Sequence, residues 1–371
     1  MGNLKVHDKL DIQAGGQVEV LDEFGSGGQG TVYKVSYNGK TYALKWYHPR
    51  VFKGKENDFY KNLENNISNG APTDAFLWPK AITKVYNDQF GYLMDVRPSG
   101  YEELTNFFVG GRKQKQARFK SFYALCTAAI NIIEAFRALH NNGYSYQDIN
   151  NGNFFINPEN GDVLICDNDN VSPFGTNLGI MGKQRWIAPE IVMGKNDPDK
   201  NSDRFSLAVV LFRLLFINHP LEGRYSTPPC MTKDAEQKYY GSAPIFVYDP
   251  STTENRPIPG TDHNLKLFWN VYPDYVKEAF IRAFSHDVMM KQKPRILEKE
   301  WLDIFIRLRT EIGRCPHCGQ ETFYTFKGSH DIPCMECSKK ISITNALQIK
   351  NQILPIFPGL KISLWTVAEF P

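Results

Sequence analysis

The stretch YSYQDINNGNFFINPENGDVLICDND, from Tyr144 to Asp169, is the part of the chain that best predicts its fold. The short apolar runs FFI and VLIC predict two strands, and the Asn, Pro and Gly residues between them predict a hairpin turn. This hairpin would carry Asp148 and Asn153 at its entrance and Asp167 at its exit. Carboxylate and amide oxygens suit a hard cation such as Mg2+. A polar surface hairpin is the simpler alternative, because Asp and Asn favour turns anyway.

The length, composition and net charge are those of an ordinary protein that can bury a sizeable core. A chain of 371 residues with 42% apolar residues predicts two or three domains. The net charge of +3 gives no electrostatic reason to expect nucleic acid or a membrane surface as partner. No apolar run approaches the length of a membrane span, and the N-terminus lacks the apolar core of a signal peptide. We therefore expect a cytoplasmic location.

A glycine cluster near the N-terminus predicts a nucleotide-binding loop. Gly25, Gly27 and Gly30 fit G-x-G-x-x-G, and Val32 extends the motif to G-x-G-x-x-G-x-V. Without Cβ atoms, the backbone amides of such a loop can close over a triphosphate. Dinucleotide-binding folds share the motif, but there it opens a helix. Here the following segment, TVYKVSYNGKTYALKWY, is β-rich and turns at Asn38-Gly39, so we expect a β-hairpin.

Further motifs follow in a fixed order. QDINNGN resembles the catalytic loop H-R-D-L-x-x-x-N of a protein kinase, and Asp167 the aspartate of D-F-G. Ala43-Leu44-Lys45 matches V-A-I-K, and Ala188-Pro189-Glu190 matches A-P-E. Asp203 resembles the aspartate that braces the catalytic loop, and Arg295 the arginine that pairs with the A-P-E glutamate. Over residues 18–310 the chain therefore resembles a bacterial member of the eukaryotic-type (Hanks-type) serine/threonine protein kinases.

The resemblance implies an α+β, bilobal fold. Residues 1–96 would form the β-rich small lobe and residues 97–312 the helical large lobe, with an ordered, irregular insertion at 221–266. The phrases ICDNDNV, APEIVMG and LFINHPLEG resemble a bacterial branch associated with phosphatase proteins. A protein substrate and an associated phosphatase or signalling partner are therefore the expected partners.

The resemblance also implies roles for individual residues. Asp148 would be the base that accepts the proton of a Ser or Thr hydroxyl, while Asn153 and Asp167 would hold Mg2+ (or Mn2+). Lys45 would contact the ATP phosphates and pair with a glutamate of the following helix, for which we favour Glu64 over Glu56. The full set of expected ATP-binding residues is Gly25, Gly27, Gly30, Val32, Ala43, Lys45, Glu64, Met94, Asp95 and Val96.

Several positions depart from the kinase pattern. Tyr146-Gln147 replaces His-Arg, and Asn168-Asp169 replaces Phe-Gly. Asn150 occupies the position of a catalytic-loop lysine, while Lys183 occupies that of an activation-segment threonine. We predict that Lys183 supplies the missing cation at the γ-phosphate and that Asn150 hydrogen-bonds Asp148.

These departures leave other functions open. A pseudokinase scaffold that binds nucleotide without transfer is one alternative, and a small-molecule phosphotransferase is another. The intact set of Asp148, Asn153 and Asp167 disfavours the first, and the A-P-E segment with Asp203 disfavours the second.

The C-terminal cysteines predict a metal site. Cys315, Cys318, Cys334 and Cys337 form CxxC-x15-CxxC, which can close a tetrahedral Zn2+ site from two short turns. We expect a structural zinc ribbon over residues 313–342, with His317 outside the ligand set. Residues 343–371 contain β-like runs and end on an apolar one, so we expect a further β segment that is cut short.

Overall fold

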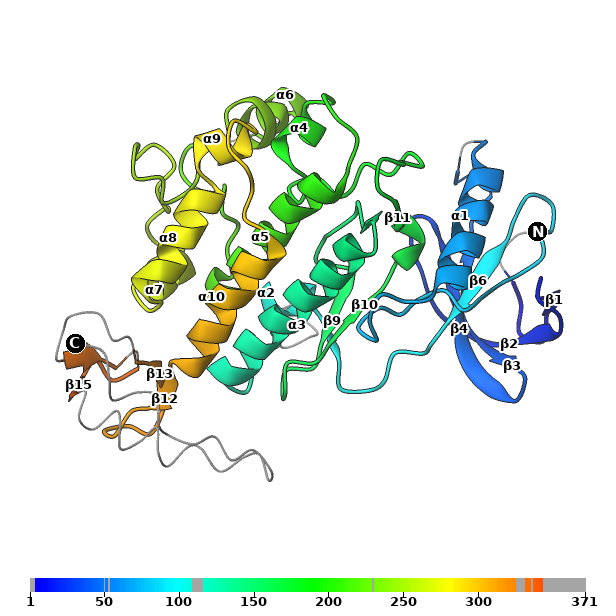
Figure 1. The fold of residues 1–371 in the computed structure, drawn as a ribbon, viewed down its shortest axis with the longest axis horizontal. Coiled ribbons are helices and arrows are strands. Elements are labelled where there is room, and N and C mark those ends of the chain that lie inside the picture. The colour runs from blue at the N-terminus through cyan, green and yellow to red at the C-terminus, as the bar shows by residue number, and fades with distance from the viewer. Residues whose placement is uncertain are drawn as a thin grey trace. The chain divides into compact units, whose positions relative to one another are not determined.

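The computed structural model describes residues 4–49, 51–52, 54–108, 116–228, 230–324, 331–334 and 336–342. The chain forms two compact units, residues 1–307 and 308–371. The first unit contains a sheet-rich part followed by a helical part, as expected for the two lobes (Figure 1). The β segment expected at 343–371 lies outside the described residues.

The small lobe is built on a six-stranded antiparallel sheet in the order β1-β2-β3-β4-β6-β5. β2 and β3 form the hairpin around the glycine cluster, and Gly25 lies opposite Val32. β3 turns into β4 through Asn38 and Gly39, which both have positive φ (50° and 74°), as a type I′ turn requires. The strands are β1 (Lys9–Asp11), β2 (Gln17–Ser26), β3 (Gly30–Tyr37), β4 (Lys40–Tyr47), β5 (Ala81–Ile82) and β6 (Gly91–Met94).

The two faces of this sheet bury different sets of side chains, because residues alternate along a strand. Leu44 and Trp46 of β4 belong to the apolar core of one face. Ala43 and Tyr47 belong to the core of the other face, which includes Phe59 of helix α1 (Glu56–Asn69). The alternation therefore assigns Lys45 to the α1 face as well.

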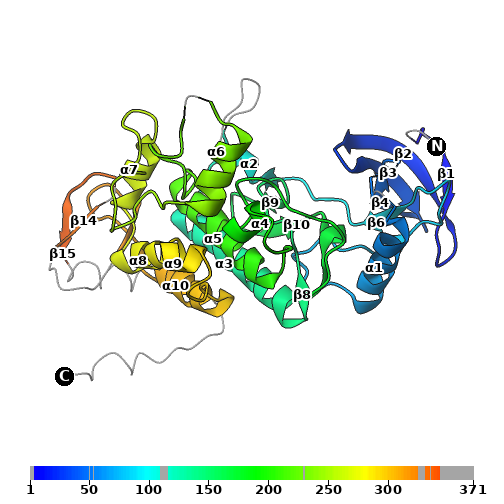
Figure 2. The same ribbon diagram turned by 90° about the horizontal axis from the view of Figure 1, so that it is seen from above.

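Two long helices form the core of the large lobe, α3 (Phe122–Asn141) and α5 (Lys200–Phe216), which lie side by side (Figures 1 and 2). The Ser121 hydroxyl caps α3 by accepting from the Ala124 amide, and Asp199 and Ser202 form a capping box on α5. By length and composition α3 could span a membrane, contrary to the expectation from hydropathy. However, 61% of its most apolar window is buried inside the protein, as in a core helix.

Short elements connect and cover these helices. The expected hairpin is present as β9 paired with β10, with Ile156 opposite Val163. Among the described residues of the insertion, the buried Asn255 donates to the Leu221 and Ile245 carbonyls. The remaining elements of the unit are β7 (Glu102–Glu103), α2 (Thr105–Phe108), β8 (Tyr144–Ser145), β9 (Phe154–Ile156), β10 (Val163–Ile165), η1 (Asn168–Asn170), β11 (Ser172–Pro173), α4 (Pro189–Val192), α6 (Lys233–Gln237), η2 (Lys238–Ser242), α7 (His263–Trp269), α8 (Asp274–Ala283), α9 (His286–Met289) and α10 (Glu298–Thr310).

The second unit contains two small antiparallel hairpins. β12 (Ile312–Arg314) pairs with β13 (Glu321–Phe323), and β14 (Asp331–Pro333) pairs with β15 (Lys340–Ser342). Each hairpin encloses one of the two CxxC pairs, so both pairs lie on turns.

Candidate active site

A cleft of about 840 Å³ brings most of the predicted site residues together. Its lining includes the glycine-rich loop, the inner strands β4 and β6, and the catalytic hairpin. Leu77, Phe155 and Cys166 also line it, and the sequence analysis did not identify these three. The predicted residues that line it are Gly25, Gly27, Gly30, Val32, Ala43, Lys45, Met94, Asp95, Val96, Asp148 and Asp167.

The glycines of the loop serve different purposes. A Cβ on Gly30 would lie 2.4 Å from the Trp46 carbonyl oxygen, so the close approach of β3 to β4 requires glycine there. A Cβ on Gly25 would meet nothing within 4 Å, and one on Gly27 would come no closer than 3.9 Å to the Gly30 oxygen. Gly30 is thus needed for packing, whereas Gly25 and Gly27 leave the loop open toward the cleft.

Amide side chains surround the carboxylate of Asp148. Asn150 donates to Oδ1 at 3.0 Å, as predicted, and Asn153 donates to the Asp148 carbonyl at 2.9 Å. Burial raises the pKa of Asp148 to about 6 against the effect of the Asn150 hydrogen bond, and the charge of Asp167 adds to the rise. A carboxylate with a pKa in this range is suited to accept a proton near neutral pH.

Asp203 fixes the backbone of the catalytic loop through hydrogen bonds. Its carboxylate accepts from the amides of Tyr146 (2.7 Å) and Gln147 (2.9 Å), so the predicted bracing role is confirmed. Tyr146 is fully buried, and its hydroxyl donates to the Cys166 carbonyl at the end of β10. The tyrosine in place of the usual histidine therefore ties the loop to the strand that precedes Asp167.

Gln147 connects the catalytic loop to the activation segment. Its Nε2 lies 2.9 Å from the Ser145 hydroxyl, 2.8 Å from the Ser172 hydroxyl and 2.6 Å from the Thr176 carbonyl. Its Oε1 accepts from Asn177 at 3.0 Å. A neutral amide thus makes the connection at the position where the kinase pattern has an arginine. The sequence showed this replacement but not the contacts.

The prediction that Lys45 pairs with Glu64 is wrong. The Lys45 ammonium lies 2.9 Å from Asp169 and 3.3 Å from Asp167, whereas the Glu64 carboxylate accepts from Gln13. Burial would lower the pKa of Lys45, but the charges of Asp167 and Asp169 outweigh it and raise the pKa. Spacing alone could not reveal this, because it depends on which face of α1 turns toward the site.

Lys183 lies beside the catalytic loop. Its ammonium donates to the Asn151 side chain at 2.8 Å. Gly182, with φ +77°, precedes it, and a Cβ there would lie 3.0 Å from the Gln147 carbonyl oxygen. The segment can approach the loop this closely because position 182 is glycine. The contact of Lys183 with a phosphate stays a prediction.

The oxygen donors fit a hard cation. The Asp167 side chain is 36% exposed and lines the cleft. The Asn153 amide nitrogen donates to the Asp148 carbonyl, which leaves its side-chain oxygen as the atom it can offer to a metal. One carboxylate and one amide oxygen, completed by phosphate and water, suit Mg2+.

Comparison with known proteins agrees with this geometry. A family model described as protein kinase domain matches residues 18–256. The chain belongs to the protein kinase domain family. The model covers the glycine-rich loop, the catalytic hairpin and much of the insertion. The two lobes that line the cleft are therefore parts of one kinase domain.

Relatives of the kinase domain are distant. The chain is 26% identical to "Probable serine/threonine-protein kinase kinX" of Dictyostelium discoideum, over 53% of this chain and 18% of the relative. It is 25% identical to "Stress-activated protein kinase alpha" of the same organism, over 59% and 33%. It is 24% identical to a serine/threonine/tyrosine-protein kinase of Arabidopsis thaliana, over 56% and 52%. The chain thus spans between about a fifth and a half of the length of these relatives.

The four cysteines of the second unit form a cluster outside the kinase domain. Their sulfur atoms lie within 4.8 Å of one another, with Cys315 and Cys337 3.8 Å apart and Cys318 and Cys334 3.7 Å apart. Tetrahedral Zn2+ with Zn–S bonds of about 2.3 Å places its sulfurs about 3.8 Å apart, so the set fits zinc. His317 Nε2 instead lies 3.1 Å from the Lys340 carbonyl oxygen.

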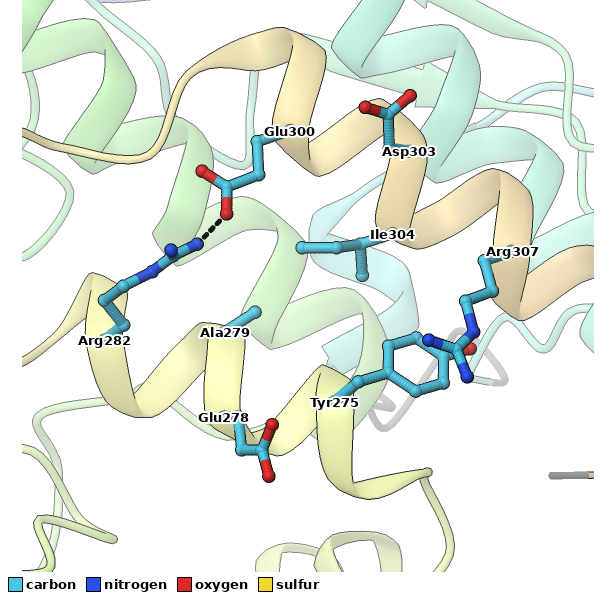
Figure 3. A pocket seen from close by; sticks show the side chains of 8 residues that line it. All are labelled: Tyr275, Glu278, Ala279, Arg282, Glu300, Asp303, Ile304 and Arg307. Atoms are coloured by element: carbon cyan, nitrogen blue, oxygen red, sulfur yellow. Dashed lines mark hydrogen bonds and ion pairs between the residues drawn. The ribbon is translucent and has the colours of Figure 1, made fainter. Parts of the chain in front are cut away.

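A second hollow of about 420 Å³ lies between α8 and α10 of the kinase domain (Figure 3). The Arg282 guanidinium pairs with Glu300 across it, and the Arg307 guanidinium lies 3.9 Å from the centre of the Tyr275 ring. These are surface interactions, and the predicted site residues line the other cleft.

Proposed function

We propose that the protein transfers the γ-phosphoryl group of ATP to Ser or Thr hydroxyls of a protein substrate. The observation that carries the proposal is the shared cleft. Asp148, Asp167 and Lys45 line it together with the glycine-rich loop. A base, a metal ligand and a phosphate-binding cation are thus within reach of one bound nucleotide.

In the proposed reaction the substrate hydroxyl oxygen attacks the γ-phosphorus, and the bond between this phosphorus and the β,γ-bridging oxygen of ATP breaks. Asp148 orients the hydroxyl and accepts its proton. Lys45 would hold the ATP phosphates in line, and Asp167 and Asn153 would hold Mg2+ (or Mn2+). When bound, the metal neutralises charge on the phosphates.

Two alternatives are disfavoured by specific observations. A pseudokinase would not need Asp148 in the cleft with a raised pKa and its amide partners. A small-molecule phosphotransferase would not need a buried anchor for the A-P-E segment, which here ties Glu190 to Arg295. The bacterial placement, the cytoplasmic location and a phosphatase or signalling partner rest on the sequence analysis and are part of the proposal.

The cysteine cluster is proposed to hold a structural Zn2+. The sulfur spacing supports this, as does the equivalence of the two turns, in which the Cys315 amide donates to Gln320 and the Cys334 amide to Lys339. A unit this small buries little apolar surface, so metal binding would supply much of its folding free energy.

A transfer assay with radiolabelled ATP and a protein acceptor tests the proposed reaction. Asp148→Asn should lower kcat by roughly two or more orders of magnitude. Asp167→Asn should abolish transfer while the kinase domain stays folded, which circular dichroism checks. Asp162→Asn, on the exposed turn of the same hairpin, is the matched control. Analysis of the labelled amino acid should show phosphoserine or phosphothreonine. Full transfer in either site variant would mean that the signal comes from a contaminating kinase, and it would favour the pseudokinase.

A further inference from the structure

The carboxylate of Asp169 is the closest charged partner of Lys45. The Lys45 ammonium lies 2.9 Å from Oδ2 and 3.1 Å from Oδ1 of Asp169. The Asp169 side chain is 1% exposed and that of Lys45 is 6% exposed, so the pair is buried. The contact with Asp167 is longer, at 3.3 Å, and Asp167 is much more exposed.

Two tyrosines of the small-lobe sheet complete the surroundings of Asp169. The Tyr47 hydroxyl on β4 donates to Oδ2 at 2.6 Å, and the Tyr92 hydroxyl on β6 donates to Oδ1 at 3.1 Å. Each carboxylate oxygen therefore has a tyrosine and the ammonium as donors. Such complete pairing is what allows a charged carboxylate to remain buried.

Helix α1 does not supply this carboxylate. Within the described residues, the buried side chains of α1 are Phe59, Asn62, Leu63 and Asn66. Both asparagines donate to the Val171 carbonyl, at 2.8 and 2.9 Å. The helix thus holds the chain just beyond Asp169 with neutral amides.

We propose that Asp169 is the positioning residue for Lys45. In this proposal the segment that carries the metal ligand Asp167 also orients Lys45, so Lys45 and Asp167 move together. The orientation of Lys45 does not depend on a glutamate of α1. Asp169 acts through Lys45 and does not touch the substrate. The inference rests on the proposed kinase function.

A double-mutant cycle tests this role. Asp169→Asn should lower kcat/KM by up to about 100-fold, the scale of a misplaced binding group. In a Lys45→Met background the same change should have almost no further effect, because both variants remove one interaction. Glu64→Gln, which removes the carboxylate originally expected to pair with Lys45, should leave kcat/KM unchanged. Additive losses in the cycle, or a loss in Glu64→Gln equal to that in Asp169→Asn, would overturn the proposal.

Thermal unfolding of the unliganded protein provides a readout that needs no phosphoryl transfer. Asp169→Asn should lower Tm, because it leaves a buried ammonium poorly paired. Lys45→Met combined with Asp169→Asn should have a higher Tm than Asp169→Asn alone. If Asp169→Asn does not fold, Tyr47→Phe replaces it in both cycles with smaller effects of the same sign. If the wild-type protein transfers no phosphate but the variants show the expected order of Tm, the proposed function is refuted and the pairing of Lys45 with Asp169 is not. A double variant less stable than Asp169→Asn would refute the pairing itself.

Discussion

The guanidinium of Arg295 holds the carboxylate of Glu190 through paired hydrogen bonds, Nη1 to Oε1 at 2.9 Å and Nη2 to Oε2 at 2.7 Å. The two side chains are only 4% and 7% exposed. Arg295 also donates to the Asn201 carbonyl at 2.8 Å. The pair that the resemblance implied is therefore present, and the contact with Asn201 also fixes the end of the activation segment to the start of α5.

Loss of one member of this pair should destabilise the kinase domain strongly. Glu190→Gln leaves a buried guanidinium without its counterion, and we expect a loss of about 3–5 kcal/mol in the free energy of unfolding. The exposed pair of Arg282 and Glu300 is the control (Figure 3), and Arg282→Ala should cost less than about 1 kcal/mol. Urea titrations measure both. Similar losses of unfolding free energy in Glu190→Gln and Arg282→Ala would contradict a strongly stabilising role for the buried pair.

The Gln147 contacts predict activity without phosphorylation of the activation segment. Ser172 is fully buried and its hydroxyl donates to the Thr176 carbonyl at 2.8 Å, so it is already part of the connection. Protein treated with phosphatase should therefore transfer phosphate as well as untreated protein. Gln147→Leu should lower kcat, whereas Thr176→Ala, which keeps the carbonyl contact, should not. A large loss on dephosphorylation would show that a phosphate and a basic group are needed.

Lys183 is predicted to stabilise charge on the transferring phosphoryl group. Lys183→Met should then lower kcat far more than it weakens ATP binding, since the contact would tighten in the transition state. The combination of Asn150→Lys with Lys183→Thr should recover part of the loss. Single-turnover kinetics with separately measured ATP affinity distinguish the two effects. An unchanged kcat in Lys183→Met would show that the lysine is only a surface residue bonded to Asn151.

A buried histidine predicts a specific pH dependence of stability. His140 lies 2.8 Å from Glu298 and 3.2 Å from Asp203. Burial would lower the pKa of His140, but the two carboxylates outweigh it and raise the pKa above its ordinary 6.5. Its stabilising effect is thus complete below pH 6.5 and is lost as pH rises through the raised value. The difference in unfolding free energy between wild type and His140→Gln should shrink over that window.

Metal analysis tests the cysteine cluster. We expect about one Zn2+ per chain, as one four-thiolate site requires. Chelation or Cys318→Ser should destabilise residues 308–342 and leave nucleotide binding by the kinase domain largely intact. Limited proteolysis followed by mass spectrometry locates the loss of structure. Stoichiometric zinc in Cys318→Ser would contradict the proposed ligand set.

The sequence by itself determined the features that depend on nearby residues. Asp148, Asn153 and Asp167 could be predicted as a group because one short hairpin carries them, and the turn chemistry of that hairpin is local. The β3–β4 hairpin followed in the same way from the local turn signal at Asn38-Gly39. The cysteine pairs were equally clear, because each CxxC forms a single tight turn.

Only the tertiary structure decided which carboxylate meets Lys45. Glu56, Glu64 and Asp169 were all available, and Asp169 lies 124 residues from Lys45 in sequence. The choice of partner depends on the rotation of α1 about its axis. This rotation turns Asn62 and Asn66 toward Val171, while the Glu64 carboxylate accepts a hydrogen bond from Gln13. It also depends on Tyr47 and Tyr92, whose hydroxyls make burial of the Asp169 charge tolerable. Such a choice is made by packing between distant segments, and no local pattern specifies it.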